Sequence, residues 1–178
     1  SRQRYVVKFY RPERWSEAQS LEEHGFTLEL IDAEIPIAPP RQIAGKTLHH
    51  YKGYLFALVA SVGGRQFEVD NLEQLEGVGR FLGRIHKIGA LSKFEHRPSI
   101  DLNEYLYQPR KILQSSEMIP VHLERSFFND LDMLITAIER HWSDNLSSLR
   151  LHGDCHPGNI LWRDGAMFVD VGHWRNGS

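Results

Sequence analysis

Cysteine is nearly missing from this chain of 178 residues, in which Cys155 stands alone. A single cysteine excludes an internal disulfide framework and favours a reducing compartment, so we expect a cytoplasmic protein. An excess of positive charge is missing too, because 21 basic residues stand against 23 acidic ones and give a net charge of −2. Nucleic-acid binding is therefore not expected, since contacts to phosphates need a basic surface.

Long apolar runs and a signal peptide are also missing. The longest apolar stretch, around residues 54–62, is far too short to cross a bilayer, and the first residues lack a signal-peptide pattern. We therefore expect no membrane partner. Hydrophobic residues make up 41% and charged residues 25%, a composition typical of a globular domain. The length favours one compact unit, which we expect to be a monomer.

The first third of the chain has the pattern of a small sheet with one helix. β-branched and aromatic residues at 5–10 predict a strand, and Ser16 with Gln19 forms a capping-box pattern for a helix that ends near Asp32. Further strands are expected at 41–43, 47–51 and 54–60, with turns at 44–46 and 52–53. These connections favour a mostly antiparallel sheet.

The chain becomes helical after a hinge at residues 60–64. Asn71 and Gln74 form a capping pair for an amphipathic helix that ends near Gly89, and a shorter helix is expected at 102–113. A long helix should follow Pro120. Its apolar residues should face inward: Leu123, Phe127, Leu131, Leu134 and Ile138. The predicted fold class is α+β, with a sheet lobe at 1–62 and a helical lobe at 63–178.

The segment from Leu151 to Asp170 carries the richest chemistry. Glycine and proline residues place Asp154 on a loop, and Asp164-Gly165 is a preferred two-residue hairpin turn. In the register set by that turn, Asn159 lies opposite Asp170, so that an amide oxygen and a carboxylate point toward one spot.

Oxygen ligands of this kind suit Mg²⁺ when water and phosphate oxygens complete the coordination shell. Asp154, on the loop before the hairpin, could accept the proton of an attacking hydroxyl group. A zinc site at His152, Cys155 and His156 is not expected, because no further cysteine or histidine pair has the required spacing.

The string His152-Gly153-Asp154, followed by Asn159, resembles the catalytic-loop motif of the aminoglycoside phosphotransferase and choline kinase-like group, which is related to the protein kinases. The longer string from His152 to Gly165 is similar in particular to a bacterial stress-response Ser/Thr protein kinase of this group. The similarity extends over nearly the whole chain, including residues 5–15 and 61–68. It implies a protein-kinase-like fold of two lobes.

The resemblance also implies a role for each matching residue. Asp154 would be the catalytic base, and Asn159 with Asp170 would bind Mg²⁺ beside the phosphates of ATP. Lys8 would contact the α- and β-phosphates. Its partner would be a glutamate of the next helix, either Glu22 or Glu23, and backbone groups from Ala60 to Val62 would face adenine.

The chain departs from the family pattern in three places. The family has strands before the lysine strand and helices after the metal-binding aspartate, so the resemblance implies a fold that is incomplete at both ends. Gly172 stands where the family usually has a second acid. The favoured prediction is an ATP- and Mg²⁺-dependent kinase that phosphorylates Ser or Thr of a protein substrate. A small-molecule kinase with an aminoglycoside, choline or homoserine-like acceptor, and a catalytically impaired, pseudokinase-like fragment, remain open.

Overall fold

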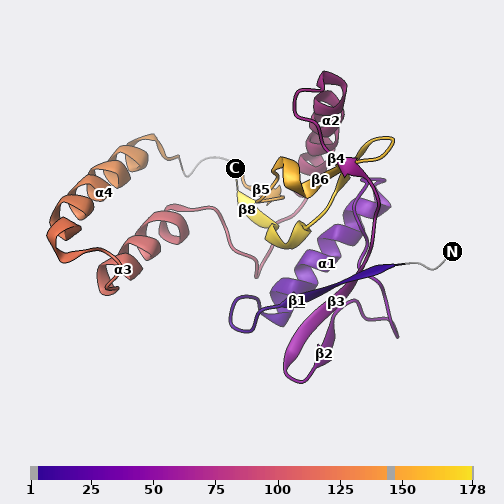
Figure 1. The fold of residues 1–178 in the computed structure, drawn as a ribbon, viewed down its shortest axis with the longest axis horizontal. Coiled ribbons are helices and arrows are strands. Elements are labelled where there is room, and N and C mark those ends of the chain that lie inside the picture. The colour runs from indigo at the N-terminus through magenta and orange to yellow at the C-terminus, as the bar shows by residue number, and fades with distance from the viewer. Residues whose placement is uncertain (1–3, 144–146, 178) are drawn as a thin grey trace.

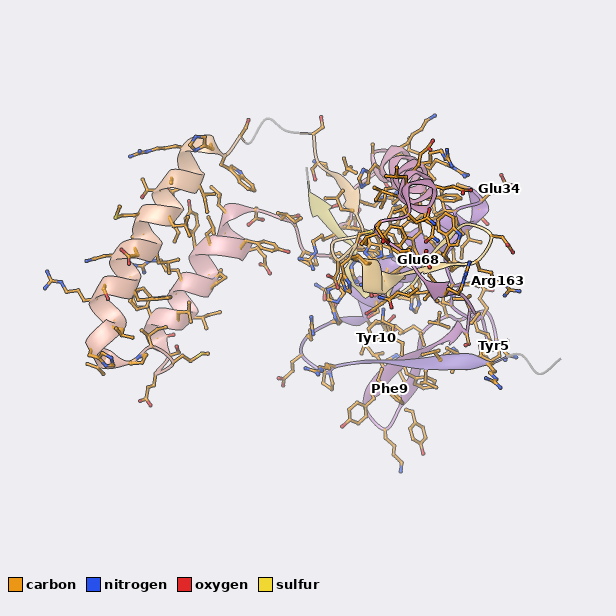
Figure 2. The ribbon with its side chains drawn as sticks, turned by 45° about the horizontal axis from the view of Figure 1, so that its top comes forward. Tyr5, Phe9, Tyr10, Glu34, Glu68 and Arg163 are labelled. Atoms are coloured by element: carbon orange, nitrogen blue, oxygen red, sulfur yellow. The ribbon has the colours of Figure 1, made fainter. Side chains whose placement is uncertain are left out.

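The computed structural model describes residues 4–143 and 147–177 (Figure 1). Its first sheet is antiparallel, with β1 (Tyr5–Tyr10), β3 (Tyr54–Ala60) and β2 (His49–Tyr51) in the order β1-β3-β2. The strand predicted at 5–10 is confirmed. Figure 2 shows Tyr10 on the side of β1 that faces the rest of the molecule and Phe9 on the opposite side.

Helix α1 (Glu17–Asp32) begins with the predicted capping box. The Gln19 backbone N–H donates to Ser16 Oγ at 3.1 Å, and the Ser16 N–H donates to the Gln19 side-chain oxygen at 2.9 Å. The buried side of α1 is unusually polar, because it contains Glu23, His24 and Thr27. Buried polar groups need hydrogen-bond partners, so this face of α1 must contact polar side chains from other elements.

The strand predicted at 41–43 is wrong. Single bridges form between Pro40 and Val59 and between Ile43 and Lys46, and they do not continue into a ladder. Pro40 has no N–H to donate, and Ala44 turns the chain at a φ of 50°. The chain therefore crosses this region as a loop, before the strand predicted at 47–51 forms in a shorter version.

Two small sheets form the second part of the molecule. One is antiparallel, with β4 (Arg65–Gln66), β6 (Ile160–Trp162) and β7 (Ala166–Phe168) in that order, and the other pairs β5 (Leu149–Leu151) with β8 (Arg175–Gly177). Helix α2 (Leu72–Gly89) has the predicted end and an N-cap bond from the Gln74 N–H to Asn71 Oδ1 at 3.2 Å. Two short helical turns, η2 (Pro157–Asn159) and η3 (Val171–His173), complete this part.

One hydrophobic core joins α1 to the second part of the chain. Phe26 and Leu30 of α1 pack in the same cluster as Phe168 and Trp174, and the Phe26 and Trp174 rings lie 4.9 Å apart between centroids. The other buried members are Ile35, Ile37, Phe67, Val78, Ile85, Phe94, Ile160 and Ala166. A boundary between lobes at residue 62 stays a prediction, because this core draws on both sides of it.

The helices η1 (Asn103–Tyr107), α3 (Gln108–Ser115) and α4 (Val121–His141) lie to one side of the molecule (Figure 1). The predicted inward orientation is wrong for three α4 residues, since Leu123, Phe127 and Leu134 are exposed. Helices α3 and α4 stand apart from the rest of the described chain (Figure 1), so part of the apolar face of α4 is left exposed. None of the helices in the described ranges combines the length and apolar character that a membrane span requires.

Candidate active site

Five of the residues predicted to form the site line one cavity of about 460 Å³. Lys8 comes from β1, Glu23 from α1, Ala60 and Val62 from the end of β3 and the loop after it, and Asp170 from the segment after β7. Lys8, Glu23 and Asp170 supply the charges in this cavity. Ala60 and Val62 belong to its largely apolar part, which is suited to a flat ring.

Lys8 is held by a buried carboxylate. Its Nζ lies 2.5 Å from Glu23 Oε1, and the Glu23 side chain is 3% exposed. The sequence left Glu22 and Glu23 open as partners, and the structure assigns the pair to Glu23. Glu22 lies outside the cavity and accepts hydrogen bonds from the backbone N–H groups of three residues: Glu95, His96 and Arg97.

A chain of polar side chains surrounds Glu23. Tyr10 Oη donates to Glu23 Oε1 at 3.0 Å and lies 2.8 Å from His24 Nε2, while His24 Nδ1 lies 2.8 Å from Thr47 Oγ1. Burial lowers the pKa of His24 to about 4. Burial and the Glu23 charge raise the pKa of Tyr10 well above its usual range. Neutral Tyr10 and His24 therefore support the Glu23 carboxylate.

Asp154 and Asn159 are joined in the loop before the hairpin. Asn159 Nδ2 donates to the Asp154 backbone oxygen at 2.9 Å and to Asp154 Oδ2 at 3.3 Å. His156 and His173 approach the same carboxylate, each with Nε2 at 3.9 Å from Oδ2. The amide nitrogen of Asn159 is thus used within the loop, so only its side-chain oxygen can act as a metal ligand.

The predicted hairpin register is wrong by one residue. Trp162 pairs with Ala166, so the connection contains three residues, and the Arg163 N–H donates to the Gly165 oxygen at 2.9 Å. The Val169 N–H donates to the backbone carbonyl oxygen of Asn159 at 3.0 Å, which places Val169 beside Asn159. Asp170 follows with a φ of 49°. This left-handed turn places the Asp170 side chain in the cavity that Lys8 lines.

The backbone of the hinge is partly occupied. The Ala60 N–H donates to the Pro39 oxygen at 3.2 Å, and the Ser61 N–H donates to the Arg4 oxygen at 3.0 Å. Two of the three backbone donors predicted to face adenine are therefore bonded elsewhere. Within the part of the chain that the structure describes, the Val62 N–H has no such partner.

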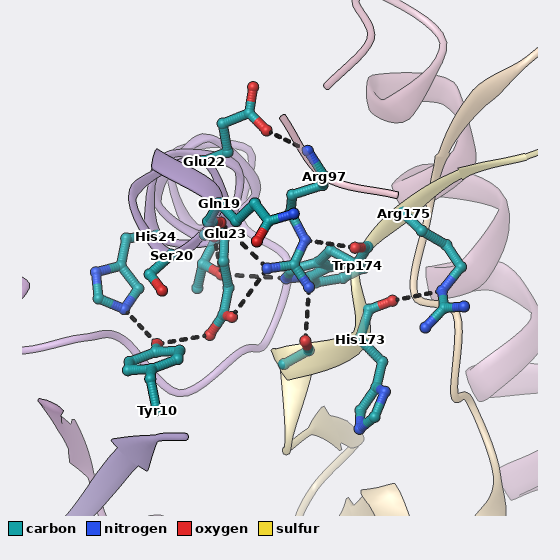
Figure 3. A network of polar contacts seen from close by, with 12 residues as sticks. Tyr10, Gln19, Ser20, Glu22, Glu23, His24, Arg97, His173, Trp174 and Arg175 are labelled. Carbon is teal, nitrogen blue, oxygen red and sulfur yellow. Dashed lines mark hydrogen bonds and ion pairs between the residues drawn. The ribbon is translucent and has the colours of Figure 1, made fainter. Parts of the chain in front are cut away.

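Arg97 belongs to the same network, although no sequence motif marks it. It lies between α2 and η1, is 3% exposed, and donates to Glu23, Gln19, Gly172 and Trp174 (Figure 3). A lone arginine in an irregular segment has no periodicity or spacing from which this role could be read.

The residues in and next to the cavity fit a magnesium nucleotide. Asp170 lines the cavity and offers a carboxylate. Asn159 does not line it, but its backbone is bonded to the lining residue Val169, and its side chain offers an amide oxygen. These are the hard oxygen donors that Mg²⁺ prefers, and Mg²⁺ usually keeps water and phosphate oxygens as its other ligands. Over residues 4–143 and 147–177 no cluster of three or more His, Cys, Asp or Glu side chains is suited to hold a metal by itself.

Comparison with protein families gives a match along the whole sequence. The model of the phosphotransferase enzyme family, APH, matches residues 1–178. The chain is 54% identical over 176 residues to stress response kinase A of Escherichia coli K12. It is 51% identical over 176 residues to the serine/threonine protein kinase RdoA of Salmonella typhimurium LT2. Both matches cover 99% of this chain and 54% of the relative, so the chain spans about half the length of these relatives.

Solved structures with little sequence similarity share the fold. The amicoumacin kinase hAmiN, in complex with AMP-PNP and Ca²⁺, superimposes with a TM-score of 0.73 at 18% identity. That match covers 97% of this chain and 53% of the kinase. The choline kinase LicA of Streptococcus pneumoniae gives a TM-score of 0.63 at 15% identity, with 98% and 57% covered. The predicted α+β, kinase-like fold is confirmed.

Proposed function

Because this chain belongs to the phosphotransferase enzyme family, we propose that it carries the catalytic centre of an ATP- and Mg²⁺-dependent kinase that phosphorylates serine or threonine in a protein substrate. The observation that carries the proposal is the shared cavity, in which the Lys8–Glu23 ion pair and Asp170 lie beside the hinge. A cation for phosphates, a carboxylate for a metal and an apolar pocket for a base are the parts that phosphoryl transfer needs.

The chain's own residues account for the proton and the phosphates. Asp154 Oδ2 accepts the proton of the acceptor hydroxyl, whose oxygen forms a bond to the γ-phosphorus as the bond to the β–γ bridging oxygen breaks and ADP leaves. Lys8, fixed by Glu23, binds the α- and β-phosphate oxygens. Bound Mg²⁺, held by Asn159 and Asp170, would supply positive charge to the phosphate oxygens.

A protein acceptor is preferred over a small alcohol because of the relatives. Relatives above 50% identity are named as stress response and serine/threonine protein kinases, whereas the small-molecule kinases hAmiN and LicA among the structures are below 20% identity. A cytoplasmic location and a monomeric state stay predictions.

Thermal unfolding with ATP, in the presence and absence of Mg²⁺, tests the site first. A cooperative transition that moves to higher temperature with Mg·ATP, and less with ATP alone, is expected, because a ligand that binds the native state stabilises it. Transfer from γ-labelled ATP is then measured with dephosphorylated casein, kanamycin and choline as acceptors. Label on casein supports the proposal, label on kanamycin or choline supports a small-molecule kinase, and a transition that ignores nucleotide contradicts both.

A further inference from the structure

Arg97 connects the phosphate-binding side of the cavity to the metal-binding side. Its Nη1 donates to Glu23 Oε2 at 3.3 Å and to the Gln19 carbonyl oxygen at 3.1 Å, both on α1. Its Nε donates to the Trp174 carbonyl oxygen at 2.5 Å, and its Nη2 donates to the Gly172 carbonyl oxygen at 2.6 Å. One guanidinium therefore bonds to both walls of the site (Figure 3).

The two walls hold the two charged groups that must act together. Glu23 uses its Oε1 for Lys8 and its Oε2 for Arg97, so the carboxylate is fixed from both sides. On the other wall, Gly172 follows Asp170 by two residues, and its carbonyl oxygen is held by the same arginine. A displacement of α1 is thus transmitted to the segment after Asp170, and the reverse, through the Glu23 carboxylate, the Arg97 guanidinium and the Gly172 carbonyl group.

The chemistry of arginine suits this position better than that of lysine. A guanidinium is planar and presents its donors in a fixed fork, whereas an ammonium is a single point that cannot reach the same four acceptors. The Arg97 side chain is fully buried and stacks on Trp15, with the guanidinium carbon 4.3 Å from the ring centroid. Trp15 therefore restrains the guanidinium in addition to its hydrogen bonds, so that Arg97 can hold α1 and the 172–174 segment at a fixed separation.

From this geometry we infer that Arg97 is a positioning residue, which couples the Lys8–Glu23 pair to the metal-binding loop at Asp170. The inference rests on the proposed function, because it concerns the joint binding of phosphates and Mg²⁺. Arg97 lies outside the residues that line the cavity, so it acts through Glu23 and the 172–174 backbone rather than on the nucleotide.

Arg150 supplies a matched control. It is also buried, also pairs with a glutamate of α1, with Nη1 at 2.7 Å from Glu29 Oε2, and also donates to a backbone carbonyl, that of Ile88. None of these bonds involves Lys8, Glu23 or the segment after Asp170. Arg97→Lys and Arg150→Lys therefore impose the same chemical change on two buried arginines, and only one of them touches the site.

The test is the ratio of ATP affinity with Mg²⁺ to ATP affinity in EDTA, measured by calorimetric titration of the full chain. Arg97→Lys should lower this ratio by about 10- to 100-fold, the usual cost of removing a group that orients metal ligands. Arg150→Lys should keep the ratio within about twofold, because a loss of stability by itself does not change how much Mg²⁺ strengthens ATP binding. An equal weakening with and without Mg²⁺ in Arg97→Lys, or no weakening, overturns the inference.

A second measurement needs no substitution at Arg97 and serves if that variant does not fold. Hydrogen exchange of the His173 and Trp174 amides is followed when ATP is added to the unsubstituted chain in EDTA. Slower exchange at both amides, lost in Glu23→Gln, is expected; protection limited to β1 and α1 overturns the inference. If the unsubstituted chain shows no nucleotide affinity at all, the proposed function fails, an outcome distinct from normal Mg²⁺ enhancement in Arg97→Lys.

Discussion

Gly172 lies directly against the ammonium group of Lys8. A Cβ atom at position 172 would come within 2.7 Å of Lys8 Nζ and 3.5 Å of Asp170 Oδ1. The absence of a side chain at 172 thus leaves room for the lysine beside the carboxylate that is proposed to bind Mg²⁺. The glycine that departs from the family pattern is, in this chain, part of the packing of the cavity.

Gly172→Ala should weaken nucleotide binding without unfolding the protein. The clash falls on the end of a flexible side chain, so Lys8 moves and its charge-assisted hydrogen bond is impaired. We expect Mg·ATP affinity to fall about tenfold, which corresponds to about 1.4 kcal/mol. The unfolding free energy should change by less than about 1 kcal/mol. Titration calorimetry and urea unfolding measure the two. The control is Gly25→Ala, whose Cβ meets no atom within 4 Å; a matching loss of affinity there would contradict the argument.

Asp154→Ala and Asp170→Ala should separate binding from transfer. Asp170 lines the nucleotide cavity, so its loss should abolish the Mg²⁺-dependent part of ATP binding. Asp154 is proposed to act on the acceptor, so its loss should leave ATP affinity within about threefold and reduce transfer by about 10²- to 10⁴-fold. Equal loss of ATP affinity in the two variants would show that these roles are wrongly assigned.

Two buried histidines should make stability depend on pH. Burial lowers the pKa of His24 and of His152 from 6.5 to about 4. The unfolded chain therefore binds more protons between these values, so stability is complete above pH 6.5 and falls as the pH decreases toward 4. Each histidine should cost up to about 3 kcal/mol over that range. Urea unfolding between pH 7.5 and 4.5 measures the loss.

His152→Phe isolates one of these contributions. The His152 ring lies 4.9 Å from the Trp174 ring, and neither of its nitrogens has a hydrogen-bond partner among residues 4–143 and 147–177. Phenylalanine should therefore fit the site and remove about half of the pH dependence. The exposed His122→Asn serves as a control and should leave the profile as it was. An unchanged profile in His152→Phe would assign the titration to other groups.

Two glycines of α2 should respond in opposite directions to alanine. A Cβ at Gly89 would collide with the backbone oxygen of Arg150, which cannot move away without shifting β5. Gly89→Ala should therefore destabilise the protein by about 3 kcal/mol. Gly83 is exposed and meets no atom within 4 Å, so Gly83→Ala should stabilise it by about 1 kcal/mol. Urea unfolding of both variants compares them, and a similar sign for the two would show that α2 does not pack as described.

The sequence predicted those parts of the site that depend on local chemistry. The strand with Lys8, the capping box of α1 and the loop with Asp154 follow from residue types over short distances, and the structure has all three. The choice between Glu22 and Glu23 could not be made in this way. Both lie on α1, and the decision depends on what faces each of them: Lys8 for one, three backbone N–H groups from residues 95–97 for the other.

The errors have a common physical origin in distant contacts and in loop geometry. The Asp164-Gly165 turn gained a residue because Arg163 bonds across it, which shifted the partner of Asn159 to Val169. Arg97 escaped prediction because its four acceptors lie more than 70 residues away in sequence. Long-range partners of this kind are set by the fold and leave no local pattern.

The acceptors that Arg97 uses on the segment after Asp170 are carbonyl oxygens of the main chain. These hydrogen bonds do not depend on which side chains the segment carries. Position 173 lies between the two bonded residues and faces Asp154, and its side chain takes no part in the bonds from Arg97. Replacements at 173 can therefore change the side chain that faces the Asp154 carboxylate while the hydrogen bonds from Arg97 stay in place. Position 173 is therefore the place in this loop where a new side chain can be brought next to Asp154 without disturbing the contacts of Arg97.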